Sequence, residues 1–560
     1  MQSIMIVLLG IVGMTFGWFV YSKFIATKIF QLDPDFVTPA HEFNDGVDYC
    51  PTNKFVLWGH HFTSVAGAAP IVGPAIAVYW GWVPAVLWVT IGTVFFAGIH
   101  DFGALWASAR HKGKSIGALS EDVIGKRTRA LFMIVIFLVL LMVNAVFGVV
   151  IANAFIGTPS AVVPAWSAIV VALVIGQFLR RGFNLTMLSI LGVIALYASI
   201  YVGSVVPMEL PDSMFGLTAN ANWIILLFIY ASIASMLPVW VLLQPRDFIN
   251  GMQLFVGLFL LYGAVLLSLP DISAPAFNTQ MVEGAPSLMP LLFVTIACGA
   301  VSGFHGIVSS GTSSKQLDKE TDARFVGYLG AIGEGSLALI TIVAVSGVAL
   351  AATPELWHQI YEKYGTAGAG TFIQGGAQMI HNGWGLPIGI STTLLATMVV
   401  LFAGTTMDSG VRLQRYIIQE WGDIYGIAVF RNGIVATLVA VTCCLLLAFG
   451  AGGAGGSGGL IIWPLFGSTN QVLAGLTLLV LSVMLIKLGR PARYTLIPMV
   501  FVMITSCWAA LIKLKEFWLA ENWLLVTIDL IVLITSLLVI LEAASVIAKF
   551  RSDSSAALKR

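Results

Sequence analysis

Charged side chains are scarce in this sequence. Lys and Arg number 28 and Asp and Glu 27 among 560 residues, so only 10% of the chain is charged, whereas a soluble globular chain carries about 25%. With 58% hydrophobic residues, the apolar surface exceeds what an aqueous core can bury, which excludes a soluble enzyme, a secreted domain and a disordered chain. The formal net charge of +1 provides no basic field for a phosphate backbone, so nucleic acid is excluded as a partner.

Cysteine is also rare, and the motifs of several enzyme classes are missing. Five scattered cysteines, an odd number, form neither a disulfide framework nor a metal-binding knuckle, so we predict no metal site and no cofactor. The sequence contains no Walker A motif, no HExxH and no GxSxG nucleophile elbow. ATP-driven transport and membrane hydrolysis therefore lack support, and we expect a protein that is not an enzyme.

Long apolar runs, in contrast, are abundant. Runs near the 20 residues needed to cross a bilayer recur along the whole chain and predict about fifteen transmembrane helices. The first run lacks the positively charged start of a signal peptide, so we interpret it as a retained span. The sequence thus predicts an all-α polytopic membrane protein, whose function is transport, channel activity or membrane-embedded catalysis.

The distribution of basic residues predicts the orientation. Residues 110–129 contain six Lys or Arg residues, and the positive-inside rule places this loop in the cytoplasm. Counting spans from there, four loops that fall on the outer side contain no Lys or Arg: residues 157–161, 207–221, 270–286 and 449–459. We therefore expect the N-terminus outside and the C-terminus in the cytoplasm.

The run 62–74 is interrupted where a spanning helix should be continuous. Gly67, Pro70 and Gly73 lie in mid-membrane together with a second proline, and the prolines remove backbone hydrogen bonds. The freed backbone groups must be buried in protein or line a cavity. Discontinuous helices form substrate sites in transporters, because half-helix N-termini attract anions and freed carbonyls bind cations. We predict that Gly67, Ala69, Pro70 and Gly73 bind substrate; a kink used only for packing is the alternative.

A second interruption occurs at residues 236–247, five predicted helices after the first. Five is odd, so the two interrupted helices should run in opposite directions, as the first members of an inverted five-plus-five repeat. Pro238 and Trp240 would complete the substrate site, and Arg246 with Asp247 would serve as a gate. The alternatives are coincidence among the 21 prolines and a neutralised loop pair.

A third anomaly is the stretch 297–312, which is rich in glycine and hydroxyl side chains and lacks leucine. Small residues let another helix approach closely, which explains the glycines but not His305. An ionisable group in a span marks an ion or substrate pathway by default, although a neutral histidine that shares a hydrogen bond is the alternative. We assign Ser302 to the substrate site, and His305, Ser309 and Ser310 to ion coupling.

Other ionisable residues extend this set. Glu334 is the deepest carboxylate and must be protonated or paired, which makes it a candidate proton carrier. Asp101 and Asp408 are further coupling candidates, although their position near the predicted inner helix ends favours a solvated or Arg-paired role. His60 and His61 lie at the predicted cytoplasmic mouth of the first interrupted helix, where we expect a gate.

Residues 450–459 contain the spacing GxGxxG. They follow a membrane span on the outer side rather than a β-strand that leads into a helix, so a dinucleotide site is not supported. We interpret the stretch as a flexible outer loop or as a strap that moves during gating.

Several blocks of sequence, taken together, are typical of one family. They are residues 41–52, Gly59-His60-His61-Phe62, 67–74, 237–240 with 245–247, 295–315 and 463–467 with 470–471. In their order and spacing they resemble the carbon starvation protein A (CstA) family of membrane transporters. The resemblance implies an inner-membrane uptake system of the amino acid–polyamine–organocation superfamily type, with peptides or pyruvate as substrates and proton coupling in the pyruvate members. It also implies a LeuT-like 5+5 inverted repeat with peripheral helices.

These observations predict three regions. Residues 1–55 would form a transmembrane helix and a cytoplasmic loop, residues 56–408 the transporter core, and residues 409–560 further transmembrane helices. Within the core, the two repeats would cover residues 56–205 and 222–408.

The function we expect is secondary active import of small carboxylate-bearing nutrients, peptides or pyruvate-like acids, across a bacterial inner membrane. The partners would be this small molecule and the lipid bilayer, with the oligomeric state left open. For a sodium ion, hydroxyls of residues 309–312 would join carbonyls near residues 66 and 69, whereas a proton would use His305 or Glu334. The rival function is a channel or a membrane nutrient sensor that works with a partner protein.

Overall fold

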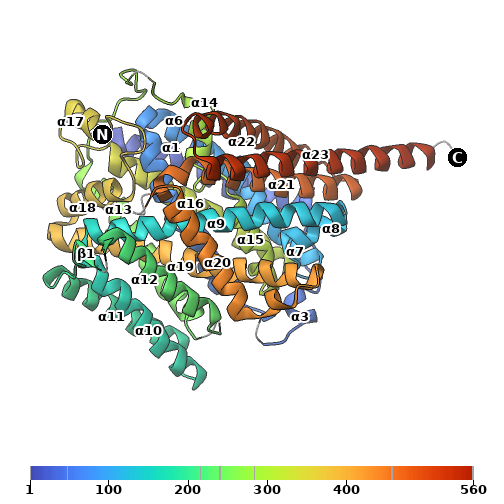
Figure 1. The fold of residues 1–560 in the computed structure, drawn as a ribbon, viewed down its shortest axis with the longest axis horizontal. Coiled ribbons are helices and arrows are strands. Elements are labelled where there is room, and N and C mark those ends of the chain that lie inside the picture. The colour runs from blue at the N-terminus through green and yellow to red at the C-terminus, as the bar shows by residue number, and fades with distance from the viewer. Residues whose placement is uncertain are drawn as a thin grey trace.

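The computed structural model describes residues 2–46, 48–214, 216–238, 241–282, 284–453, 455 and 458–557, and nearly all regular structure among them is helical (Figure 1). Thirteen helices in this described part are long and apolar enough to cross a membrane, and a bent helix pair provides a fourteenth crossing. The all-α polytopic fold expected from the apolar runs is confirmed. Three residues of the glycine-rich stretch, 454, 456 and 457, lie outside the described residues.

The α-helices have the following bounds: α1 (Gln2–Phe16), α2 (Ser22–Phe24), α3 (Pro39–Glu42), α4 (Lys54–Ala66), α5 (Ala69–Ala77), α6 (Trp82–Gly92), α7 (Gly98–Arg110), α8 (Ile116–Val123), α9 (Lys126–Gly157), α10 (Val162–Arg180), α11 (Leu185–Val205), α12 (Ala219–Met236), α13 (Leu243–Ser268), α14 (Leu288–Thr295), α15 (Gly303–Gly311), α16 (Leu329–Ser346), α17 (Pro354–Ile360), α18 (Ala369–Trp384), α19 (Ile388–Ile424), α20 (Gly433–Gly450), α21 (Gly458–Lys487), α22 (Arg493–Leu519) and α23 (Trp523–Ala557). Short 3₁₀ and π-helical turns are η1 (Gly17–Tyr21), η2 (Ile25–Phe30), η3 (Val78–Trp80), η4 (Thr93–Ala97), η5 (Pro159–Ala161), η6 (Ser313–Lys315), η7 (Glu320–Asp322), η8 (Arg324–Tyr328) and η9 (Ala428–Arg431). Strands β1 (Ser213–Met214) and β2 (Leu217–Thr218) pair antiparallel.

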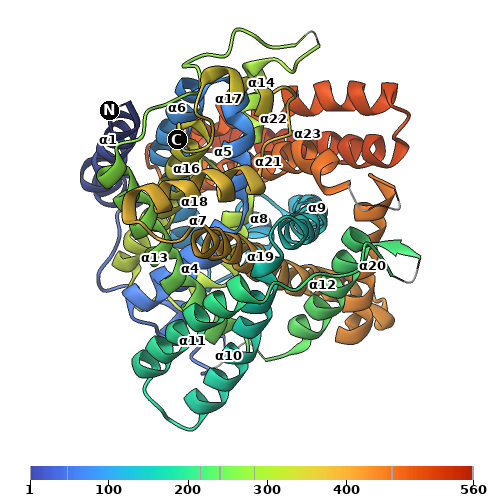
Figure 2. The ribbon, with the colours of Figure 1, turned by 90° about the vertical axis from the view of Figure 1, so that its left-hand side faces the viewer.

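Helices α9, α19 and α21 form the interior of the bundle, and α10 and α11 lie together at its edge (Figure 2). The most apolar windows of the spans that contain α9 and α21 are 89% and 94% buried, whereas those that contain α10 and α11 are 39% buried. Edge helices with apolar side chains on their exposed faces suit contact with lipid. In the interior, Asn144 of α9 donates to Gln414 of α19 at 3.1 Å, and this bond links the two helices.

The first interruption is present where the sequence predicts it. Helices α4 and α5 form one crossing that bends by 48°. Helix α4 ends at Ala66 because Gly67 adopts φ +47°, a left-handed conformation that glycine tolerates. The chain becomes helical again at Ala69, with Pro70 in the first turn, where its missing N–H costs little.

A second broken segment consists of α14 and α15. These helices contain 8 and 9 residues, too few to cross a bilayer singly, and non-helical residues 296–302 separate them. Gly299 in this break has φ +93°. The stretch that the sequence marks as rich in small residues is therefore the break itself together with the helix that follows it.

The prediction that residues 236–247 interrupt a span is wrong. Helix α12 ends at Met236 and α13 begins at Leu243, and both are apolar enough to be separate crossings. Pro245 lies in the first turn of α13, where proline is tolerated. Six candidate spans lie between the two broken segments, so their offset is seven. Seven is also odd, so the first broken segment still has a partner that should run in the opposite direction. That partner is α14 with α15 rather than residues 236–247.

Candidate substrate and coupling site

The two broken segments lie side by side in opposite directions. At one end, just before α4, the Thr52 amide donates to the carbonyl of Gln316, just after α15, at 3.0 Å. At the other end, the indole of Trp80 after α5 donates to the carbonyl of Pro286 before α14 at 2.9 Å. An antiparallel pair of broken helices is the arrangement from which inverted-repeat transporters build a central site.

The breaks themselves meet in the middle of this pair. A Cβ at Gly73 of α5 would lie 2.4 Å from the Thr295 carbonyl oxygen at the end of α14, so only glycine allows this approach. A Cβ at Gly299 would lie 3.6 Å from the Cβ of Pro70. Pro70 and Gly73, two of the four substrate residues predicted from the first interruption, are therefore brought against the second break.

The hydroxyl nearest to Gly67 belongs to α19. A Cβ at Gly67 would lie 2.8 Å from Thr406 Oγ1, a residue that the sequence did not single out. Ser310, expected to bind sodium, instead donates to the Gly306 carbonyl at 2.6 Å and accepts from the Ile116 amide at 2.9 Å. These bonds use Ser310 to pack α15 against α8.

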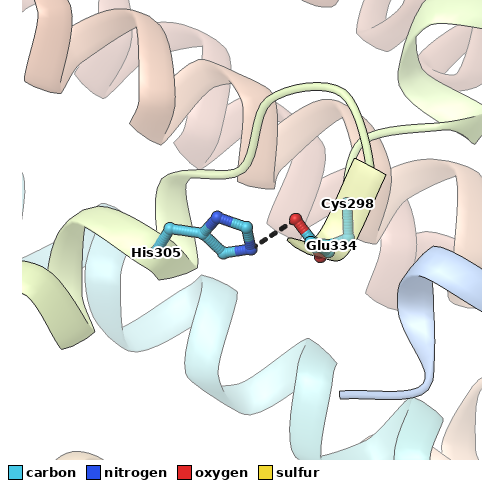
Figure 3. A group of neighbouring side chains, drawn as sticks. All are labelled: Cys298, His305 and Glu334. Carbon is cyan, nitrogen blue, oxygen red and sulfur yellow. Dashed lines mark ion pairs between the residues drawn. The ribbon is translucent and has the colours of Figure 1, made fainter. Parts of the chain in front are cut away.

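A chain of four buried titratable groups crosses the site. Nε2 of His305 in α15 lies 3.2 Å from Oε2 of Glu334 in α16 (Figure 3). The other ring nitrogen, Nδ1, is 2.8 Å from Oδ2 of Asp101 in α7, and the second oxygen of Asp101 is 2.7 Å from Nδ1 of His100. All four side chains are at most 1% exposed. The expectation that Glu334 is protonated or paired is met by its pairing with His305.

The favoured role for Asp101, solvated or Arg-paired, is wrong. Its carboxylate is fully buried and its ion-pair partners are imidazoles. The cause is close packing of α7 on α15: a Cβ at Gly306 would lie 3.1 Å from Cε1 of His100. The position of Asp101 near a predicted helix end could not reveal its contact with His305.

Polar side chains from three elements surround the second break. Sγ of Cys298 donates to Oγ of Ser302 at 3.3 Å, and Nδ2 of Asn470 in α21 donates to the same oxygen at 3.0 Å. Cys298, His305 and Glu334 also offer sulfur, nitrogen and oxygen atoms within 4.8 Å of one another, a donor set that suits a transition metal. The sequence prediction found Ser302 but missed Cys298 and Asn470, which no local spacing connects.

A cavity of about 450 Å³ leads towards the breaks from the side of the basic loop. Its walls include Ser64 of α4, Ile307 and Val308 of α15, and Ser409 of α19. The charged residues that line it are Asp48, Lys114, Asp247, Lys315, Arg412 and Glu420. Lys114 has a side chain that is 43% exposed, so this end of the cavity reaches the surface. We name this cavity the vestibule.

The two adjacent histidines of α4 hold it in two places. Nδ1 of His60 in the vestibule lies 3.2 Å from Oδ2 of Asp247 in α13. Nδ1 of His61, which is fully buried, lies 2.8 Å from Oγ of Ser313 in η6. Separation of α4 from α13 and η6 would break both contacts, and the gating role expected for His60 and His61 stays a prediction.

Arg246 pairs with Asp408 rather than with its neighbour in sequence. Its guanidinium forms an ion pair with Asp408 of α19, and Nη1 donates to the Tyr230 hydroxyl of α12 at 2.7 Å. Tyr230 in turn donates to Asp408 at 2.7 Å. Both charged side chains are at most 4% exposed. The Arg-paired role expected for Asp408 is present, and the pair is buried.

Aromatic side chains close the opposite side of the breaks. Tyr364 shares a 2.7 Å hydrogen bond with Thr295, and the Tyr361 hydroxyl donates to the Ala75 carbonyl at 2.8 Å. Tyr79, Trp80 and Trp357 pack against these tyrosines. Burial raises the pKa of Tyr364 to about 12, so its hydroxyl keeps its proton near neutral pH. We name these five aromatic residues, Tyr79, Trp80, Trp357, Tyr361 and Tyr364, the aromatic lid.

Two predicted substrate residues do not join the breaks. Pro238 is exposed, and it follows Leu237, whose carbonyl accepts from Arg412 in the vestibule wall at 2.6 Å. It therefore lies in the loop between two spans rather than in a broken helix. Trp240 lies outside the described residues.

Comparison with known proteins agrees with the family resemblance of the sequence blocks. The model of the family described as carbon starvation protein CstA matches residues 2–356 and 345–509. The chain belongs to the carbon starvation protein CstA family. CstA relatives include "Peptide transporter CstA" of Campylobacter jejuni, 32% identical over 90% of this chain and 79% of the relative. A second, "Pyruvate/proton symporter BtsT" of Escherichia coli, is 31% identical over 88% of this chain and 79% of the relative. These relatives carry the names of transporters, not enzymes.

A CstA relative from Bacillus subtilis, also named "Peptide transporter CstA", is 28% identical over 93% of this chain and 91% of the relative. Among solved structures, that of MhsT in complex with L-phenylalanine aligns with 88% of this chain and 99% of MhsT. Its TM-score is 0.46 and its sequence identity 13%.

Proposed function

We propose that this CstA-family protein is a secondary active importer that carries small carboxylate-bearing nutrients, peptides or pyruvate-like acids, together with protons across a bacterial inner membrane. The observation that carries the proposal is the meeting of two antiparallel broken helices beside a buried titratable cluster, with a vestibule on one side and the aromatic lid on the other. Access from one side at a time is what a carrier needs and what a continuous pore lacks.

The substrate carboxylate would bind at the helix N-termini of the breaks. Helices α5 and α15 begin there, at Ala69 and Gly303, and a helix N-terminus presents free amides and a positive dipole end to an anion. Gly67, Pro70 and Ser302 would line this position. Free acids should then compete for uptake while their esters and amides do not, and equal competition by both would exclude a carboxylate at this position.

A proton would be carried by the His305–Glu334 pair. Both groups change charge on protonation, and Asp101 on the far side of the ring would hold the imidazole in place. The similarity to a protein named as a proton symporter supports a proton over sodium. The sodium alternative needs oxygen ligands only, and Thr406 beside Gly67 is better placed for it than Ser310.

The vestibule would face the cytoplasm, because Lys114 of the basic 110–129 loop lies at its entrance. The N-terminus would then be outside. A membrane-impermeant thiol reagent should modify a cysteine at Lys114 only from the cytoplasmic side and one at Asp212 only from the outside. Modification of both from the same side would reverse the proposed topology.

The proposal is tested with the purified protein in proteoliposomes. Counterflow of labelled pyruvate, lactate, amino acids and di- and tripeptides should produce accumulation against a gradient for at least one class, which a channel cannot do. Variants His305→Ala and Glu334→Gln should lose the response of uptake to an imposed pH gradient while exchange of substrate partly survives. His381→Ala and Glu355→Gln, two exposed positions, are the matched controls. Full gradient-driven uptake by both site variants, with a strict need for Na⁺, would assign the coupling to sodium.

A further inference from the structure

We propose that Cys298, His305 and Glu334 form a buried three-ligand site for a thiophilic divalent cation of the Zn²⁺ class, and that the bound ion locks the carrier. The three side chains come from three elements: the break 296–302, α15 and α16 (Figure 3). Their donor atoms, a sulfur, a ring nitrogen and a carboxylate oxygen, are ligand types that Zn²⁺ binds in proteins.

The spacing of the donors fits a small ion. Zn²⁺ forms bonds of about 2.0 to 2.3 Å, so two ligands of a tetrahedral site lie about 3.3 to 3.8 Å apart. The three donor atoms already lie within 4.8 Å of one another, and Nε2 of His305 is 3.2 Å from Glu334. A small movement of Cys298 would complete the contact. Three protein ligands leave a fourth position for water or a substrate group, as in zinc sites that remain open.

Two further observations point to a ligand at this place. In the described part of the chain, Oε1 of Glu334 is buried without a hydrogen-bond partner, and Nε2 of His305 has only its 3.2 Å ion-pair contact with the other Glu334 oxygen. On the other side of the ring, Nδ1 of His305 is held by Asp101 at 2.8 Å, and Asp101 is held by His100 at 2.7 Å. A carboxylate behind a histidine is the arrangement that orients the ring for a metal and raises its basicity.

The bound ion would lock the carrier because its ligands come from different elements of the fold. A bound ion would join the non-helical break to α15 and α16, so these parts could not separate without breaking a metal–ligand bond. It would also occupy Nε2 of His305 and the Glu334 carboxylate. The route to the site is through the vestibule, whose wall includes Ile307 and Val308, one helical turn or less beyond His305. Metal binding is a property of the folded chain, whereas the lock rests on the proposed function.

The direct test is the absorption spectrum of the purified full-length protein titrated with Co²⁺ in detergent. We expect one bound Co²⁺ per chain, with a thiolate-to-cobalt charge-transfer band that Zn²⁺ removes. Cys298→Ser should lose this band. Cys444→Ser, which changes another buried cysteine in α20, should keep it. Asp101→Asn should keep the band and bind Co²⁺ about 10- to 100-fold more weakly, because it only supports His305.

X-ray absorption of the Zn²⁺-loaded protein gives a readout without any substitution. One sulfur at about 2.3 Å with nitrogen or oxygen neighbours is the expected shell. The proposal would be overturned by a shell without sulfur. It would also be overturned if the Co²⁺ band persisted in Cys298→Ser or disappeared in Cys444→Ser. In proteoliposomes Zn²⁺ should inhibit uptake by the unmodified protein, and Cys298→Ser should be less sensitive relative to its own zinc-free rate. If Co²⁺ binds as described but no uptake occurs, the proposed function fails while the metal site stands.

Discussion

The two sides of the paired breaks are closed by different chemistry. The aromatic lid covers one side with buried rings and two tyrosine hydrogen bonds, to Thr295 and Ala75. On the other side, the vestibule is a cavity of about 450 Å³ whose lining includes charged and hydroxyl groups. Close-packed rings exclude water, whereas charged pairs exchange with water when they separate. Under the proposed function, this structure would be a carrier that is sealed by the lid and open at the vestibule.

The comparison also explains which parts must be rigid. The helices behind the vestibule are held by a buried charge pair, Arg246 with Asp408, which is costly to split. The lid depends on many small contacts, each of which is inexpensive to lose. The effects of substitutions on the two sides should therefore differ in size. The predictions below run from the largest expected effect to the smallest.

The largest effect is expected on the vestibule side from Asp408→Asn. The substitution leaves the buried Arg246 without its counter-ion and should lower stability by about 3–5 kcal/mol. Thermal unfolding in detergent is the measurement. Asp423→Asn, whose carboxylate is 71% exposed and pairs with Arg431, is the control and should change stability by at most about 1 kcal/mol.

A double variant sharpens this prediction. Replacing both Arg246 and Asp408 by methionine removes the two charges together and should be less destabilising than Asp408→Asn alone. Equal losses in the single and double variants would show that the loss in Asp408→Asn does not come from leaving the Arg246 charge unpaired.

An intermediate effect is expected where the broken helices cross. Gly73→Ala places a Cβ 2.4 Å from the Thr295 carbonyl, so the two helices must move apart, at a cost of about 1–3 kcal/mol. Uptake should fall with stability, because the same contact forms the site. Gly389→Ala, at a helical position with nothing within 4 Å, is the matched control. Normal stability of Gly73→Ala would contradict the described crossing.

The smallest effect is expected at the lid. Tyr364→Phe removes one hydrogen bond to Thr295, worth about 0.5–1.5 kcal/mol, and should favour the conformation in which the lid opens. In a cysteine-free background, a reporter cysteine at Thr312 in the vestibule should then react more slowly, by at most the change of about 2- to 12-fold in the equilibrium constant to which that energy corresponds. Tyr425→Phe, an exposed tyrosine, should leave the rate unchanged.

The sequence predicts the first break well and the second only in part. Gly67 and Pro70 interrupt an apolar run with residues that have a direct backbone effect, so the break could be located without the structure. The second break contains no proline, and its location depends on how residues 296–302 pack against α5. The prolines near residue 240 instead lie at the ends of separate helices, where they do not interrupt a span.

The residues of the coupling site are likewise predicted only in part from the sequence. His305 and Glu334 stand out because ionisable residues are rare in apolar runs, but their neighbour Asp101 is distant in sequence. Cys298 precedes His305 by only seven residues, but a single cysteine in an apolar run looks like an ordinary packing residue. Only the packing of α7 on α15 brings Asp101 to His305. Thr406 and Asn470 could not be selected at all, since polar residues of their kind are common in membrane helices.

The central claim is that the breaks form a site reached from one side at a time. Its most direct test measures the reaction rates of two reporter cysteines in proteoliposomes, one at Thr312 in the vestibule and one at Ala367, buried beside the lid. Adding substrate with an imposed proton gradient should change the two rates in opposite directions. If both cysteines become reactive together under one condition, the chain forms a continuous pore and the carrier account is wrong.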